Sequence, residues 1–334
     1  MADSFGLMII WILELTGASY LLSYGAEHLS KFFGTRFVGR TFLSVATTLP
    51  EIAIVAYAAA AGFFDTAISS ALGSNLLMMT LGLSIMLLIA TTRLSKHPLK
   101  EIDVRQFKLD KYLLIITAVV SLFMFIDGFQ FIDGIIFSAM FGAYLYLAYW
   151  EMIKERKQMK EAMMNQNSEP HPHSRKETVK ATSTFIIGTI GIFVGAEPFI
   201  HALEETAVDF GISVAILAVI ISPIAGEMPE KISLMILARK GAAGTSIAVA
   251  NVLGSKILNN TLLFAVAVFG GMIYHGFTSQ IPVNNILWYQ MILVTVITIV
   301  ALIPMLRNKL NLKSGILLLA LYIIGIGIMF FLPQ

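Results

Sequence analysis

Long apolar runs, separated by short polar connections, recur along this chain and restrict what it can fold into. Hydrophobic residues make up 57% of the sequence and charged residues only 13%, against about 25% charged in a soluble domain. A helix needs about 20 mainly apolar residues to cross the hydrocarbon of a bilayer. We therefore expect an all-α polytopic membrane protein with ten transmembrane helices. Their expected ranges are 7–24, 37–62, 66–92, 111–127, 130–150, 181–203, 211–238, 244–270, 285–306 and 312–332.

The basic residues predict how these spans are oriented. Cytoplasmic loops carry an excess of Lys and Arg, and all but two of the 23 basic residues fall in every second connection, starting with the first. We therefore expect both termini to face outside, in a prokaryotic plasma membrane. The two exceptions, Lys231 and Lys256, lie inside expected spans.

The two halves of the chain carry the same short patterns in the same order. Leu49-Pro50-Glu51 recurs as Met228-Pro229-Glu230, and residues 71–75 (ALGSN) recur as 252–256 (VLGSK). Each half holds five expected spans, an odd number, so the halves enter the membrane from opposite sides and form an inverted repeat. We expect the first five-helix repeat over 1–150, a cytoplasmic linker over 151–180 and the second five-helix repeat over 181–334.

Acidic residues within the spans predict a cation site. A carboxylate at bilayer depth is costly and marks a functional site by default. Glu51 and Glu230 each follow a proline, so we expect a break in each helix there: a proline cannot donate to the preceding turn and leaves a backbone carbonyl free. Carboxylates together with neutral oxygens suit a hard cation such as Ca²⁺. Further candidate ligands are Thr47, Thr48, Asn75, Glu227, Asn251, Ser255 and Asn259.

These patterns resemble those of the sodium/calcium exchanger family, within the calcium/cation antiporter superfamily, in its short prokaryotic form. The resemblance is carried by Thr47-Thr48-Leu49-Pro50-Glu51 and the Gly73-Ser74 that follows. It implies that Glu51 and Glu230 bind calcium and, in exchange, sodium, by alternating access with the first and sixth spans as sliding gate helices. It also implies a secondary antiporter rather than an enzyme. The expected partners are calcium and sodium ions and membrane lipid, with no nucleic acid and no cofactor beyond the transported ions; the oligomeric state stays open, with a monomer favoured.

Departures from the family pattern leave the exchanged ions open. Gly226-Glu227 stands where sodium/calcium exchangers have Thr-Ser. Because a clustered carboxylate can carry a proton, a calcium/proton antiporter is an alternative, and exchange of another divalent cation such as magnesium is a third.

Two lysines within the spans need a compensating charge, because a buried ammonium beside a cation site repels the substrate unless it is paired. We expect Lys256 to be neutralised by Glu227; a rival hypothesis is that Lys256 takes the place of one coupling cation. For Lys231 we expect a side chain that extends toward the cytoplasm.

Overall fold

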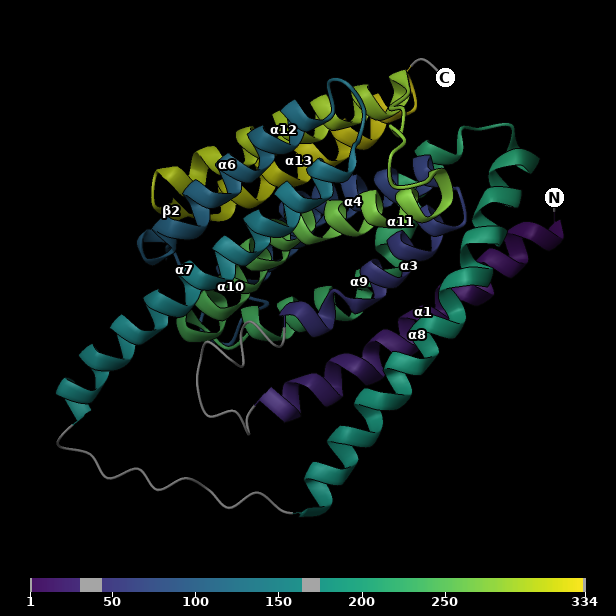
Figure 1. Cartoon of the computed structure of the whole chain (residues 1–334). Helices are drawn as coiled ribbons and strands as arrows, with labels where there is room; N and C mark the ends of the chain where they lie inside the picture. Colours follow the sequence, from purple (N-terminus) through teal and green to yellow (C-terminus); the bar gives the residue numbers. More distant parts are fainter. Residues whose placement is uncertain (1, 31–43, 164–174, 333–334) are drawn as a thin grey trace.

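The computed structural model describes residues 2–30, 44–163 and 175–332, which are predominantly helical (Figure 1). The first half contains α1 (Ala2–Ser30), α3 (Leu49–Ala60), α4 (Phe64–Leu77), η2 (Met78–Gly82), α5 (Leu83–Thr91), β1 (Ile102–Asp103), η3 (Arg105–Phe107), α6 (Lys108–Met124) and α7 (Phe131–Met163). The second half contains α8 (Arg175–Phe210), α9 (Val214–Ala238), α10 (Ala242–Leu258), η4 (Asn259–Leu263), α11 (Phe264–His275), α12 (Asn285–Leu306), β2 (Lys309–Leu310) and α13 (Leu312–Met329).

Apolar helices dominate the described residues. Seven of the helical stretches found there are long and apolar enough to cross a membrane, and α3 is a shorter apolar helix of 12 residues. The expected linker over 151–180 is partly helical, because α7 continues through 163 and α8 begins at 175. Residues 164–174 of that linker lie outside the described residues.

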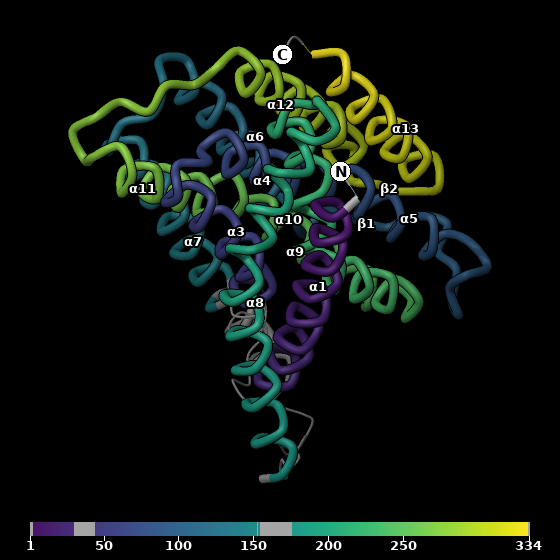
Figure 2. The backbone as a smooth tube through the Cα atoms, turned by 90° about the vertical axis from the view of Figure 1, so that its right-hand side faces the viewer, coloured from purple at the N-terminus to yellow at the C-terminus, as the bar shows by residue number. Residues whose placement is uncertain are grey.

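Helices α1 and α8, one from each half, lie side by side along one flank of the molecule (Figures 1 and 2). Glycines let their backbones touch. A Cβ atom added to Gly25 would lie 2.6 Å from the backbone nitrogen of Phe185, and one added to Gly188 would overlap the backbone of Leu22. Small residues permit this close approach between membrane helices, so the pair packs backbone to backbone.

Two long helical stretches are interrupted at matching places. The α-helical hydrogen bonding of α4 and α5 gives way to a π-helical turn, η2, at Met78–Gly82, and that of α10 and α11 gives way to η4 at Asn259–Leu263. The two turns are separated by the same offset as the repeated segments 71–75 and 252–256. Such π-turns are frequent at functional sites.

The centre of the molecule is a close crossing between α4 and α9. A Cβ atom on Gly73 would overlap the carbonyl oxygen of Val219 and lie 2.8 Å from the ring of Pro223. Pro223 has no N–H to offer that carbonyl, which stands one turn before it. The glycine of one half thus lies directly on the proline-modified turn of the other half.

Connections predicted for the same side of the membrane contact one another. Strand β1 pairs antiparallel with β2, with Ile102 opposite Leu310, and the amide of Lys96 donates to the carbonyl of Arg239 at 3.4 Å. We call this end, formed by residues 92–107, 238–241 and 306–311, the basic end. At the opposite end Phe129 bridges to Ile281, and it is there that α1 begins and α13 finishes (Figure 1).

Candidate cation site

Glu51 and Glu230 meet inside the protein, one from each half. Glu51 lies in the first turn of α3 and Glu230 lies in α9, with side chains only 4% and 3% exposed. The Glu51 carboxyl packs against the backbone of α9, because a Cβ atom on Gly226 would lie 3.2 Å from its Cδ. Gly226 lies one turn before Glu230 in α9, so the Glu51 carboxyl reaches the turn that carries Glu230. A pair of acids predicted from two separate segments is therefore assembled in one buried place.

Each of these two carboxylates keeps one oxygen unsatisfied. Oε2 of Glu51 and Oε2 of Glu230 are buried without a hydrogen-bond partner among the described residues. Asn251 of α10 donates from Nδ2 to Oε1 of Glu230 at 2.8 Å. Asn251 is the candidate ligand whose side chain contacts Glu230, through its amide group rather than its oxygen, and it lies four residues before Ser255 on the same face of a helix. The free oxygens and the uncompensated charge are what a cation would satisfy.

The helix break that the sequence predicts before Glu51 is present. Residues 44–47 are helical, Thr48 is the N-cap of α3 and Pro50 occupies its first turn, where a missing N–H costs nothing. The hydroxyls of Thr47 and Thr48 donate to the carbonyl of Ser44 at 3.1 and 2.9 Å. Both hydroxyl oxygens are buried and retain lone pairs.

The corresponding break in the second half is absent, so that expectation is wrong. Helix α9 continues through both Pro223 and Pro229. Membrane helices tolerate proline because neighbouring helices and polar side chains satisfy the freed backbone groups. The two halves therefore supply their acids differently: Glu51 from the start of a helix, and Glu230 from within one.

Glu227 pairs with Lys231, and this corrects two expectations. The two side chains form an ion pair one turn apart in α9, and both are buried. Residues four apart share a helix face, so Glu227 meets Lys231 rather than Lys256. Lys231 is only 5% exposed, so it does not extend toward the cytoplasm.

The other predicted ligands are buried on flanking helices, and no described contact joins them to the two glutamates. Asn75 of α4 donates to Oδ1 of Asn260 at 2.7 Å, and Asn260 donates to Thr117 at 3.3 Å. Lys256, 1% exposed, and both amide atoms of Asn259 have no hydrogen-bond partner among the described residues. Ser255 is buried in α10.

The donor set limits what the centre can do. Within the described ranges, no three of His, Cys, Asp and Glu come together as a metal site. A cation held by Glu51 and Glu230 would therefore take its remaining ligands from hydroxyls, amides, backbone carbonyls or water. That is the oxygen chemistry of Ca²⁺ and Na⁺ rather than of a tightly held structural metal.

Comparison with known proteins gives concordant matches. The family model described as sodium/calcium exchanger protein matches residues 3–150 and 180–331. The chain is 27% identical over 326 residues to an uncharacterized membrane protein of Methanocaldococcus jannaschii, covering 96% of each. It is also 26% identical over 256 residues to a putative antiporter, CaxA, of Alkalimonas amylolytica, covering 76% of this chain and 75% of that one.

Two solved structures share the fold. The H⁺/Ca²⁺ exchanger CAX superposes with a TM-score of 0.78 at 18% identity, over 98% of this chain and 84% of that one. The sodium-calcium exchanger NCX_Mj, soaked with Na⁺ and Sr²⁺, superposes with a TM-score of 0.64 at 24% identity, over 97% of both chains. At these identities the likeness concerns the arrangement of the helices.

Proposed function

The chain belongs to the sodium/calcium exchanger family, and from this we propose that it is a secondary antiporter that exchanges calcium for sodium by alternating access. The observation that carries the proposal is the buried pair Glu51 and Glu230, contributed by helices α3 and α9 of the two halves. Two carboxylates with unsatisfied oxygens bind either one divalent cation or monovalent cations in its place. Competition for one set of oxygens is what exchange requires.

We propose that the chain crosses a prokaryotic plasma membrane ten times, as two inverted five-helix repeats with both termini outside. The matching π-turns η2 and η4 support the repeat. The clustering of basic connections at one end supports the orientation. Helices α1 and α8 hold equivalent places in the two halves, and their glycine-lined contact suits two helices that slide.

Within the site, we propose that Thr47 and Thr48 add oxygens beside Glu51. Asn75, Ser255 and Asn259 complete the set when the helices rearrange around a bound ion. Glu227 is occupied by Lys231, so its part is to hold Lys231 away from the ions.

Proton coupling is the second candidate. It is supported by the superposition on the H⁺/Ca²⁺ exchanger CAX, which has the higher of the two TM-scores. A buried carboxylate pair can release calcium by taking up protons, just as it can by taking up sodium.

Uptake of radioactive calcium into proteoliposomes separates the candidates. We expect an outward sodium gradient at fixed pH to drive uptake, and Glu51→Gln to abolish it. Uptake driven by an outward proton gradient without sodium would instead assign the alternative. If neither gradient drives uptake of calcium by the wild type, the antiporter proposal is wrong.

A further inference from the structure

A basic cavity lies at the basic end, where α6 begins and α12 finishes. Its volume is about 240 Å³. It is lined by Arg105, Lys108, Lys111, Tyr112, Leu306 and Asn308, so the lining contains three basic side chains and no carboxylate. The candidate cation site contributes no residue to it.

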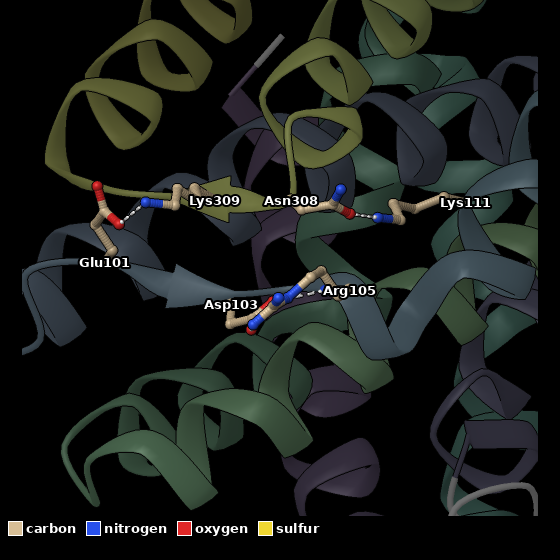
Figure 3. Close-up of polar contacts among 6 residues, drawn as sticks. All are labelled: Glu101, Asp103, Arg105, Lys111, Asn308 and Lys309. Carbon is tan, nitrogen blue, oxygen red and sulfur yellow. Dashed lines mark hydrogen bonds and ion pairs between the residues drawn. The ribbon is translucent and has the colours of Figure 1, made fainter.

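Paired loops from the two halves hold the cavity together. Lys111 is 3% exposed and donates to the carbonyl of Met305 at 3.1 Å. It also donates to Oδ1 of Asn308 at 2.6 Å (Figure 3). Both acceptors are neutral, so they position the ammonium without cancelling its charge. The amide of Val104 in turn donates to the carbonyl of Asn308 at 3.2 Å. The positive charge of Lys111 is therefore built into the fold rather than carried on a loose surface side chain.

Arg105 lines the cavity with its guanidinium already paired to a carboxylate. Its Nε and Nη2 donate to Oδ2 of Asp103 at 2.8 and 2.5 Å, and its backbone amide donates to Oδ1 at 2.9 Å (Figure 3). These hydrogen bonds, the side-chain ones first, lower the pKa of Asp103 to about 2. Residues 101–111 and 307–313 together carry six basic and three acidic side chains. The region is therefore net positive even with this pair formed.

Apolar ridges start at the cavity and run along two helices. On α6, Tyr112 lines the cavity, and Ile116 and Phe123 follow it on the same face, all more than half exposed. On α12, Leu306 lines the cavity, and Ile303 is exposed one turn away. The two helices contact each other. A basic hollow thus joins a continuous apolar surface of the kind that faces lipid.

We propose that this cavity binds the phosphate headgroup of an anionic phospholipid, whose acyl chains lie along α6 and α12. Lys and Arg at the membrane boundary attract anionic lipid, and a tyrosine with an apolar ring and a polar tip suits the interface. Free phosphate would contact only the basic side chains of the cavity, whereas a lipid would also contact the adjoining apolar side chains of α6 and α12. The surface therefore favours a lipid. Since the cavity is formed by loops of both halves, a bound lipid fastens β1 and β2 at the membrane surface.

Lipid binding to the purified full chain tests the proposal. The chain in detergent is titrated with phosphatidylglycerol, with phosphatidylcholine of the same chains and with inorganic phosphate, and bound molecules are counted by native mass spectrometry. We expect phosphatidylglycerol to bind at least tenfold more tightly than either of the others. If phosphatidylcholine binds as tightly, the binding comes from the acyl chains and not from the charged headgroup. If inorganic phosphate binds as tightly, the site is one for free phosphate. Either result overturns the proposal.

Three variants locate the binding. Lys108→Gln removes one exposed charge from the cavity and should weaken phosphatidylglycerol binding about fivefold. Lys100→Gln, the matched control, removes an exposed lysine of the same connection outside the cavity and should change it less than twofold. Asp103→Asn releases Arg105 and should tighten binding, a gain that misfolding cannot imitate. Equal losses for Lys108→Gln and Lys100→Gln, or weaker binding by Asp103→Asn, would contradict the proposal.

Discussion

At the scale of single residues, the ion pair between Glu227 and Lys231 decides how much negative charge the centre presents. Both side chains are buried in α9: Glu227 lies about one turn before Glu230, and Lys231 directly follows Glu230. With this pair neutral, Glu51 and Glu230, the proposed ligands of the transported ion, are left as the unpaired acids of the centre. The centre therefore presents two unpaired carboxylates, although Glu227, a third acid, lies within about one turn of Glu230.

The pair makes a direct prediction for stability. Lys231→Met should lower the free energy of unfolding by about 3–5 kcal/mol, because it leaves Glu227 buried without its counter-charge. Lys231→Met combined with Glu227→Gln should recover most of that loss, since no unpaired charge remains. Chemical unfolding in detergent measures both variants. A double variant as unstable as Lys231→Met alone would show that the two residues do not compensate each other.

The sequence was sufficient to predict the acids but not their neighbours. Proline followed by glutamate in two apolar runs identified Glu51 and Glu230. The partner of Glu227 was predicted wrongly as Lys256, because Lys231 was expected near the end of its helix, where a long side chain reaches water. The structure instead buries that turn of α9. Glu227 and Lys231 are four residues apart in one helix, and this spacing should have favoured their pairing over a pair with the distant Lys256.

At the scale of elements, the contact between α1 and α8 depends on missing side chains. Gly188→Ala would place a methyl group against the backbone of Leu22, and overpacking of this kind costs about 1–3 kcal/mol. We expect a lower unfolding temperature and slower calcium transport.

The same helix pair offers a matched control. Gly17→Ala, on α1, adds a methyl group where no atom lies within 4 Å, and it should leave both the unfolding temperature and transport near those of the wild type. Equal losses for the two substitutions would show that the α1–α8 contact is not responsible, since alanine favours a helix more than glycine does.

The sequence predicted which segments are helical, but it did not predict where the helices depart from regular α-helical hydrogen bonding. Apolar runs of spanning length predicted the helices, since length and hydropathy set that requirement. The π-turns at Met78–Gly82 and Asn259–Leu263 leave the hydrophobic pattern unchanged and were not predicted. The continuity of α9 through Pro223 and Pro229 was missed because a proline signals a lost hydrogen bond, while the compensating contacts come from other helices.

At the scale of the whole molecule, the two ends differ in charge, and this predicts an orientation that can be measured. The chain contains no cysteine, so single cysteines can be introduced without a background. Lys100→Cys at the basic end should react with a membrane-impermeant thiol reagent only from the cytoplasmic side. Thr278→Cys, in the connection between α11 and α12, should react only from outside. Both positions are exposed. Labelling of both from the same side would contradict the proposed topology.

At this scale the short motifs that recur in order predict an internal repeat, whereas nothing in the sequence predicted how the two halves interlock. The crossing of Gly73 over Val219 joins residues from different halves, and no periodicity within one helix encodes such a contact. The clustering of basic connections was foreseen, but the pairing of β1 with β2 between them was not, since each strand has only two residues.

The two-residue ladder between β1 and β2 limits which parts of the molecule can move relative to each other. It joins the loop before α6 in the first half to the loop after α12 in the second half. The halves therefore cannot separate at the basic end without breaking these hydrogen bonds. Because the halves are interlocked at Gly73 and joined at one end, we expect the bulk of the helices to stay fixed during transport. We expect the flanking pair α1 and α8, with glycines at its contact, to be the part that moves.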